Sequence, residues 1–346
     1  MSNAKSGRLV EIDALRGVAA LAVVLFHYTT RFTDLFKPGT LPAISFPGGH
    51  YGVNLFFIIS GFVIFMTLDK TQRPLDFVVS RFSRLFPAYW AAIFLTFFIC
   101  HWLGLPGKLV GAETALANIA MLHGLFGVAH VDGVYWTLEV ELLFYCGMLL
   151  LYRLQWLNRV HQVLLALLLL RLGYYVAEHQ FGINLPWIMF RLMILQYIPW
   201  FALGISIYLA TNRRIESGWL RPALTSSMAI AILWLCQSAF VAALAAGLSG
   251  AVFLAANGKL PILRFWPFVW LGTVSYPLYL LHENIGWAIQ LRLLSFEVPL
   301  DLAILVALAI SLAMAGLLTR FVERPAMQWI RAHYRSRVNL TRSCAG

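Results

Sequence analysis

Two ionisable residues in the first apolar stretch have the types and the spacing for chemistry inside a membrane. Arg16 and His27 are eleven positions apart in a run that begins near Val10. Eleven residues make about three helical turns, so both side chains fall on one face of a helix, about 16 Å apart along its axis. A guanidinium binds anions, and an imidazole exchanges protons near neutral pH. The structural alternative is a snorkelling arginine and a hydrogen-bonded buried histidine.

Other polar residues interrupt apolar stretches, where each costs several kcal/mol unless it is paired or faces a polar cavity. Asn54 and Ser60 lie among aromatic residues, and interhelical hydrogen bonding is their structural alternative. Glu139 and Glu141 are two residues apart and point to different sides of a helix. We expect Glu141, the deeper one, to pair with a buried cation and Glu139 to be interfacial. His282 is placed in the outer half of the membrane, like His27.

Two further arginines are three residues apart, just ahead of Pro87. Arg81 and Arg84 therefore share one side of a helix. Two neighbouring guanidiniums suit a phosphate or pyrophosphate group. The alternative is that they only mark the cytosolic side of the membrane.

The composition requires lipid around much of the chain. Of the 346 residues, 60% are hydrophobic and 12% are charged, against about 45–50% and 25% in soluble domains. We predict an all-α, polytopic membrane helix bundle of about ten transmembrane helices, in one domain over residues 1–346 with a basic tail at 326–346. The expected spans are about 10–31, 51–68, 87–104, 136–152, 161–177, 191–210, 222–240, 241–256, 267–289 and 301–320.

The distribution of basic residues predicts the topology. A net charge of +11 would suit nucleic acid, but the basic residues lie in short loops between the spans, which excludes that class. Among the 26 lysines and arginines, most lie on the side of the N-terminus, Lys5, Arg8, Arg213 and Arg214 included. The positive-inside rule therefore places both termini in the cytosol of a multi-pass protein of the bacterial inner membrane. Those on the opposite side are Arg31, Lys37, Lys108 and Arg292.

The cysteines give no sign of a metal site. The sequence has four, Cys100, Cys146, Cys236 and Cys344, and they form no CxxC pair. We expect neither a disulfide framework nor a bound metal.

These motifs, in their order and spacing, resemble the acyltransferase-3 family of integral-membrane acyltransferases. The resemblance extends from Ile12 to Pro325, and its most specific part is the pair formed by a basic residue and a histidine with ten residues between them. The matching pieces are Arg16 to His27, Gly52-Val-Asn-Leu-Phe-Phe through Ser60-Gly-Phe62, Arg81-Phe-Ser-Arg-Leu-Phe-Pro87, Trp136-Thr-Leu with Glu141, Ser275-Tyr-Pro through His282, and Glu323-Arg-Pro325.

The chain departs from the family pattern at two positions. The family often has Asp where this chain has Asn54, and Ser where it has Thr137. The asparagine argues against an acid role at that position. The chain resembles the stand-alone type, without the esterase domain that follows in other members.

The resemblance implies that Arg16 and His27 are essential, that acyl-CoA is the donor and that a sugar hydroxyl of a surface or secreted glycan, or of its lipid-linked precursor, is the acceptor. Acetyl is the family's default acyl group. The expected catalytic residues are His27, Arg16, Glu141 and His282, and the expected donor-binding residues are Arg16, Arg81, Arg84, Asn54 and Ser60.

Two mechanisms and two functions stay open at this point. His27 acts as general base for direct transfer to the sugar, or an acyl-enzyme relays the group outward. The outer segment 105–135 is expected to select the glycan. The alternative function is a transporter or flippase for a glycan or small solute, because such proteins also carry charges inside the membrane.

Overall fold

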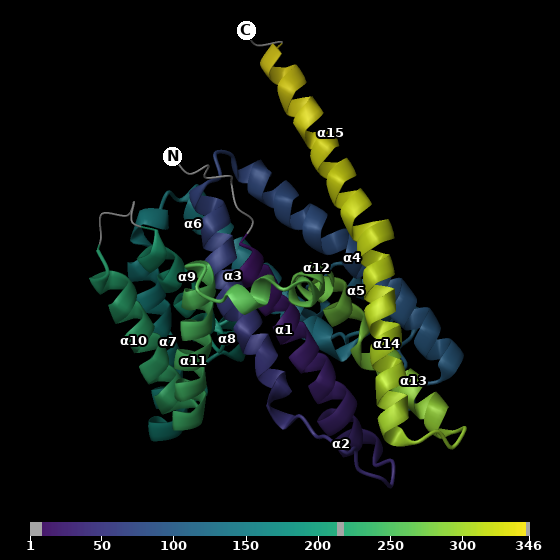
Figure 1. Cartoon of the computed structure of the whole chain (residues 1–346). Helices are drawn as coiled ribbons and strands as arrows, with labels where there is room; N and C mark the ends of the chain where they lie inside the picture. Colours follow the sequence, from purple (N-terminus) through teal and green to yellow (C-terminus); the bar gives the residue numbers. More distant parts are fainter. Residues whose placement is uncertain (1–8, 213–217, 344–346) are drawn as a thin grey trace. The chain divides into compact units, whose positions relative to one another are not determined.

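The computed structural model describes residues 9–212 and 218–343, with side chains up to Arg337. Lys5, Arg8, Arg213, Arg214 and Cys344, which entered the charge and cysteine arguments, lie outside the described residues. All regular elements in the described part are helical, which confirms the predicted all-α class. Figure 1 follows them along the chain.

The chain forms two compact units. The first comprises Met1–Ala19, Tyr51–Lys70 and Thr137–Gly272, and the second comprises Ala20–His50, Thr71–Trp136 and Thr273–Gly346. Helix α1 passes from the first unit to the second at Ala19, and helix α12 does so at Gly272. The single-domain organisation stays a prediction.

The first unit is built around α9. Every residue of α9 from Ile198 to Leu209 is buried, as expected of a helix that is apolar on all sides. It packs against α3, α7, α10 and α11. The helices of this unit are α1 (Val10–Phe26) up to Ala19, α3 (Gly52–Asp69), α6 (Trp136–Arg153) from Thr137, α7 (Val160–Phe181), α8 (Trp187–Leu192), α9 (Ile198–Thr211), α10 (Leu220–Cys236), α11 (Ala239–Ala256) and the start of α12 (Trp266–Leu281).

The second unit contains a long helical rod. Helix α14, the π-helical turn η7 and α15 follow one another without a break (Figure 1), α13 packs on α14 and α4, and α15 packs on α4. Tyr28, Tyr89 and Trp287 are among its fully buried side chains. Its helices are the end of α1 with the π turn η1 (His27–Arg31), α2 (Phe32–Phe36), α4 (Pro74–Leu103), α5 (Ala112–Asn118), the end of α12, α13 (Glu283–Leu294), α14 (Leu300–Leu318), η7 (Thr319–Glu323) and α15 (Arg324–Ser343).

Several predicted boundaries were wrong. Helix α4 begins at Pro74 and not near 87, and Pro87 lies inside it. Pro74 stands in the first turn, where a proline is well tolerated. Pro87 removes one backbone hydrogen bond of the helix, and buried residues on both sides of it keep the helix in place. Arg81 and Arg84 therefore lie within α4 and not ahead of it.

Other predicted spans consist of two helices each. The stretch 191–210 falls on α8 and α9, and the stretch 267–289 falls on α12 and α13, which meet at His282. The long apolar run after Pro222 divides at Gln237–Ser238, slightly earlier than expected. There the Ser238 hydroxyl caps α11 by accepting a hydrogen bond from the Val241 N–H, at 3.2 Å.

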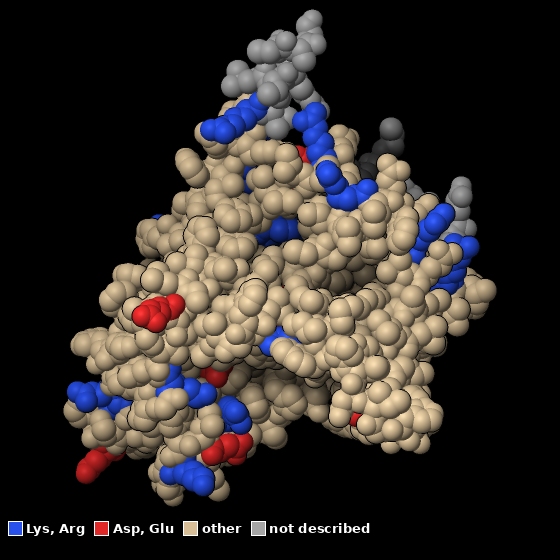
Figure 2. Space-filling model, turned by 180° about the vertical axis from the view of Figure 1, so that it is seen from behind, with Lys and Arg blue, Asp and Glu red and all other residues tan. Residues whose placement is uncertain are grey.

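The described helices have the dimensions and composition of membrane spans. Six are long and apolar enough to cross a bilayer, and two shorter apolar helices, α9 and α10, accompany them. Most of the face in Figure 2 belongs to neither acidic nor basic residues, and lysines and arginines gather there in small groups. The membrane class is thus supported, while the number of about ten spans stays a prediction. The six are found in Pro47–Asp69, Pro74–Leu103, Gly133–Arg153, Leu157–Phe181, Ala239–Ala256 and Leu300–Arg337.

Helices α3 and α9 approach each other backbone to backbone through two glycines. A Cβ on Gly204 would collide with the carbonyl oxygen of Ile58, and one on Gly61 with that of Phe201. Small residues at membrane helix contacts permit such an approach and improve van der Waals packing.

We expect Gly204→Ala to destabilise the first unit. The methyl group gains about 1 kcal/mol in helix propensity, but overpacking a backbone contact costs about 1–3 kcal/mol. Gly147→Ala in α6 is the matched control, because no atom outside its own helix backbone lies within 4 Å of the added Cβ. Thermal unfolding in detergent should show a lower midpoint for Gly204→Ala alone; equal midpoints for both variants would contradict this packing.

Candidate functional site

The second unit brings two of the sequence-predicted catalytic residues into direct contact. His282 Nε2 lies 3.0 Å from His27 Nδ1, although the residues are 255 positions apart. The His27 side chain keeps 14% exposure, whereas His282 is fully buried. His27 is therefore the member of this histidine pair that a reactant can reach.

His27 stands at the point where the first helix changes its geometry. Helix α1 is α-helical from Val10 to Phe26, and the π turn begins at His27. Side chains compete there for backbone acceptors: the Thr29 hydroxyl donates to the Leu25 carbonyl, at 2.7 Å, and His27 Nδ1 lies 3.0 Å from the Val23 carbonyl. A π turn leaves backbone groups for other partners, and Trp287 Nε1 donates to the His27 carbonyl, at 2.9 Å.

His282 occupies the junction of two helices. Its Nδ1 lies 2.8 Å from the Tyr279 carbonyl and 3.2 Å from the Leu278 carbonyl, and it caps the last turn of α12. The Tyr28 hydroxyl donates to the His282 carbonyl, at 2.8 Å, and accepts from Ser311, at 2.6 Å. A Cβ on Gly286 would occupy the place of the Tyr28 hydroxyl, so a glycine is needed there.

These hydrogen bonds fix the tautomers of both rings. The two carbonyl oxygens facing His282 Nδ1 only accept, so this nitrogen carries the hydrogen, and the Nε2 of the neutral ring accepts. His27 Nδ1 must then be the donor toward His282 Nε2. The remaining nitrogen, His27 Nε2, has a free lone pair in the neutral ring and is the basic atom of the site.

A pair of carboxyl groups lies beside that basic atom. Glu283 Oε2 is 3.8 Å from His27 Nε2, and the Glu283 side chain is hydrogen-bonded to Asp132. Asp132 also accepts from the backbone N–H groups of Asn284, at 3.0 Å, and Val134, at 3.2 Å. It thereby caps the first turn of α13, where the helix dipole favours a negative charge.

The carboxyl pair is an electrostatic partner for an imidazolium. Burial raises the pKa of Asp132 to about 6, while its backbone hydrogen bonds, the contact with Glu283 and the charge of Lys108 act in the opposite direction. Two hydrogen-bonded carboxyl groups need one proton between them, so the pair carries one negative charge at neutral pH. Lys108 lies over the Trp287 ring, 5.5 Å from its centroid, in the predicted outer segment.

The predictions that Glu141 pairs with a buried cation and that Glu139 is interfacial were wrong. Glu139 is 2% exposed and receives two hydrogen bonds from Arg191, at 2.8 and 3.1 Å. Glu141 instead accepts from the hydroxyls of Ser60, at 2.8 Å, and Tyr145, at 2.6 Å. The two carboxylates do face different neighbours, but the rotation of α6 places Glu139, and not Glu141, against Arg191. Ser60 and Glu141 are thus joined in the first unit by a hydrogen bond.

Arginines of α4 and α15 form a basic group in the second unit. Arg331 donates to the Ser83 hydroxyl, at 3.1 Å, and to the Ser80 carbonyl, at 3.2 Å. Arg84 and Arg335 are close enough to repel its charge. Arg81 donates to the Ser80 hydroxyl, at 3.0 Å. Nothing in the sequence pattern assigned α15 to the predicted phosphate site, because its arginines lie in the predicted basic tail 326–346.

The remaining predicted residues belong to the first unit. Arg16 lies in α1 and Asn54 in α3, and both are half-buried. The unbroken α-helix up to Phe26 preserves the register that relates Arg16 to His27. Their participation in one polar conduit stays a prediction. Within residues 9–212 and 218–343, no group of three His, Cys, Asp or Glu side chains is arranged to hold a metal ion, and Cys100, Cys146 and Cys236 are free thiols.

The structure adds Glu283, Asp132 and Trp287 to the site. A signal for Glu283 was present, since a carboxyl next to a histidine in an apolar span is costly unless it is partnered. Asp132 belongs to the outer segment 105–135, which was expected only to select the glycan. Its position depends on the docking of that segment against α13, which no local pattern encodes.

Comparison with known proteins places this chain in a family. The family model described as an acyltransferase domain (Acyl_transf_3) matches residues 9–320, nearly the whole chain. The chain belongs to this family of membrane acyltransferases, as the resemblance of its motifs indicated. No solved structure matches it.

Three relatives come from rhizobia. "Nodulation protein 10" of Rhizobium leguminosarum bv. viciae is 26% identical over 374 aligned positions, which cover 93% of this chain and 94% of that protein. "Protein 2 in picA locus" of Rhizobium radiobacter is 39% identical over 114 positions, or 31% of this chain and 54% of that protein. "Exopolysaccharide production protein ExoZ" of Rhizobium meliloti is 30% identical over 118 positions, covering 32% and 37%. This chain thus spans about half of the Rhizobium radiobacter protein.

We expect Asp132→Ala to destabilise the second unit more than Asp132→Asn. Alanine leaves the buried N–H groups of Val134 and Asn284 without an acceptor, at about 1–3 kcal/mol each, whereas the asparagine carbonyl retains one of them. Asp301→Ala serves as the control, because its partner, the Ala43 N–H, is exposed. The thermal unfolding midpoint should be highest for Asp301→Ala, lower for Asp132→Asn and lowest for Asp132→Ala. A midpoint for Asp132→Ala equal to that of the control would contradict the capping role.

Proposed function

We propose that this protein transfers an acyl group, acetyl by the family's default, from acyl-CoA to a hydroxyl of a surface or secreted polysaccharide or its lipid-linked precursor. The observation that carries the proposal is the histidine pair, which leaves a bare imidazole nitrogen beside an anionic carboxyl pair in a chain of an acyltransferase family. Relatives named for exopolysaccharide production and nodulation support a glycan acceptor.

The proposed chemistry is direct transfer with His27 as general base. His27 Nε2 takes the proton of the sugar hydroxyl while the hydroxyl oxygen attacks the thioester carbonyl carbon. The tetrahedral intermediate collapses, the carbon–sulfur bond breaks, and the CoA thiolate leaves with the proton returned by the imidazolium. The products are the sugar ester and CoA with a free thiol. The negative charge of the Asp132–Glu283 pair stabilises the imidazolium between the two proton transfers.

Most of the remaining predicted residues have a place in this proposal. The basic group on α4 and α15, which includes Arg81 and Arg84, binds the anionic phosphates of the nucleotide on the cytosolic side. Arg16, eleven positions before His27 in the chain, is the proposed contact of the pantetheine arm. His282 holds the tautomer of His27, and Glu141 with Ser60 stabilises the helix contact of α3 and α6. The protein is placed in the bacterial inner membrane with both termini in the cytosol, as the distribution of basic residues predicts.

We expect His27→Gln to abolish acyl transfer while the protein folds and inserts normally. Loss of general-base catalysis lowers a rate by about 10²–10⁴-fold. His101→Gln in α4 is the control, because the hydrogen bond and the ring contact of this exposed histidine are both with Phe97 of the same helix. Purified variants should be compared by release of the CoA thiol in the presence of the glycan fraction. A His27→Gln protein that releases CoA at the rate of His101→Gln would remove the catalytic assignment.

We expect the double substitution Arg81→Ala with Arg84→Ala to raise the apparent KM for acyl-CoA. The loss of two guanidiniums weakens phosphate binding without changing the reacting groups, so kcat at saturating donor should stay near that of the wild type. Arg153→Ala, an exposed arginine at the end of α6 on the same predicted side of the membrane, is the control. Initial rates over a range of acetyl-CoA concentrations give both constants. An unchanged KM in the double variant would refute the docking site.

A further inference from the structure

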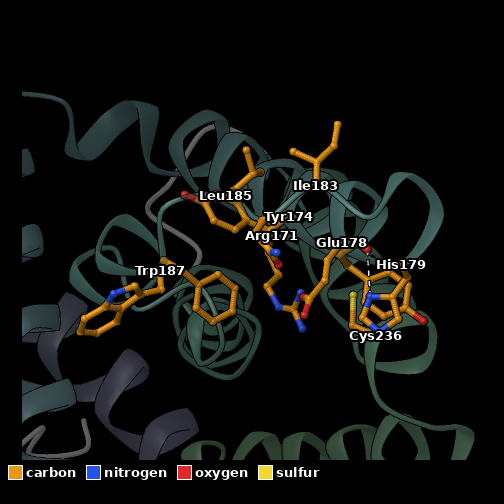
Figure 3. A pocket seen from close by; sticks show the side chains of 11 residues that line it. Arg171, Tyr174, Glu178, His179, Ile183, Leu185, Trp187 and Cys236 are labelled. Carbon is orange, nitrogen blue, oxygen red and sulfur yellow. Dashed lines mark hydrogen bonds between the residues drawn. The ribbon is translucent and has the colours of Figure 1, made fainter.

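A pocket in the first unit is unused by the chemistry described above. Its volume is about 390 Å³, and it is formed by the last turns of α7, the turn that follows them, α8 and the end of α10. Figure 3 shows side chains of these segments around it, with Arg171, Glu178 and Trp187 among them. Ligand pockets measure about 300–1,000 Å³, so this one is large enough for a small ligand.

The aromatic side chains of the pocket are held in place by their own contacts. The Tyr174 hydroxyl donates to the Pro186 carbonyl, at 3.2 Å, and its ring lies 5.4 Å from that of Phe190. Tyr175 stacks on His179 at a centroid distance of 4.2 Å. Trp187 is 62% exposed, and the Arg191 guanidinium carbon lies over its ring, 5.8 Å from the centroid. Flat, fixed aromatic faces of this kind bind the apolar faces of ring-shaped ligands at little entropic cost.

The polar groups of the pocket balance in charge. Arg171, with its guanidinium carbon 5.2 Å from the Phe190 ring centroid, contributes hydrogen-bond donors, and Glu178 contributes acceptors. The two are seven residues apart on α7, which places them on one side of the helix, two turns apart. Asn184 adds both a donor and an acceptor. A pocket with one cation and one anion favours a neutral ligand that has many hydroxyl groups.

The predicted topology puts this pocket on the side of the acceptor. The span that becomes α7 runs outward, so Glu178, the turn at Ile183 and the end of α10 at Cys236 all belong to the outer face. Exposed apolar side chains, among them Phe181, Trp187 and Met189, surround the pocket and suit the headgroup region of a bilayer. A lipid-linked glycan presents its sugars at this level.

We infer that the pocket binds a neutral pyranose unit of the acceptor glycan, with Trp187 and Tyr174 against the ring and with Arg171, Glu178 and Asn184 on its hydroxyls. The inference rests on the proposed function and deepens it, because it assigns acceptor recognition to α7 and α8 in addition to the outer segment 105–135.

Binding of simple sugars to the full-length protein tests the site without catalysis. The probes are the methyl glycosides of glucose, galactose and N-acetylglucosamine, observed by saturation-transfer NMR in a polyoxyethylene detergent, which has no sugar head group. Arg171→Gln and Trp187→Ala should each weaken the binding at least tenfold. Arg292→Gln is the matched control, because Arg292 also stacks on a phenylalanine, at 4.9 Å from the Phe296 centroid, but lies outside the pocket. Glycerophosphoethanolamine tests for a zwitterionic lipid head group.

Alkylation of Cys236 by N-ethylmaleimide gives a second readout, because this thiol lines the pocket (Figure 3). With Cys146 and Cys344 replaced by serine, the bound glycoside should slow the reaction in the wild-type pocket and not in Trp187→Ala. Absence of protection by every glycoside, or stronger binding of glycerophosphoethanolamine than of any glycoside, would overturn the inference.

Kinetics separate this inference from the proposed function. Arg171→Gln should raise the apparent KM for the glycan acceptor about tenfold and leave the KM for acetyl-CoA unchanged. Glycoside binding without any acyl transfer by the wild type would refute the proposed function and keep the site. Acyl transfer with the same acceptor KM in Arg171→Gln and Arg292→Gln would refute the site alone.

Discussion

The hydrogen bond between His282 Nε2 and His27 Nδ1 governs the arrangement of the second unit. Buried polar groups are costly unless every donor meets an acceptor, and two imidazoles in an apolar bundle satisfy this demand only in a definite order. The carbonyls of Leu278 and Tyr279 orient His282, which then accepts from His27. The consequence is chemical, because the only nitrogen left with a free lone pair is the more exposed one.

The backbone of helices α12 and α13 supports this arrangement of hydrogen bonds. Helix α12 ends at His282, and α13 begins with Glu283, so a helix C-terminus and a helix N-terminus meet at one point. The C-terminus offers carbonyl oxygens to an imidazole, and the N-terminus offers N–H groups to Asp132. A base and an anion are thereby placed side by side, and the glycine at 286 leaves room for Tyr28 to tie the junction to α14.

Little solvent reaches the histidine pair, because His282 is fully buried and the His27 side chain is 14% exposed. An imidazole that gains a proton in an apolar environment needs a nearby negative charge, and the Asp132–Glu283 pair supplies one without a mobile ion. The histidine pair and the Asp132–Glu283 pair therefore depend on each other. The donor phosphates and the acceptor sugar bind on separate surfaces, at the basic group of α4 and α15 and at the pocket of α7 and α8 in our proposals.

The amino-acid sequence determined the class of the protein, most of the helices, and the spacing of Arg16 and His27, because hydrophobicity and the helical period of 3.6 residues are local properties. Local patterns did not show that Pro87 lies within a helix, or that helix α12 ends just before His282. Only the tertiary structure decided that His27 meets His282, that Asp132 reaches Glu283, and that Arg191 selects Glu139 rather than Glu141. These contacts depend on how each helix is rotated and docked against its neighbours, and residues far apart in the chain set that together.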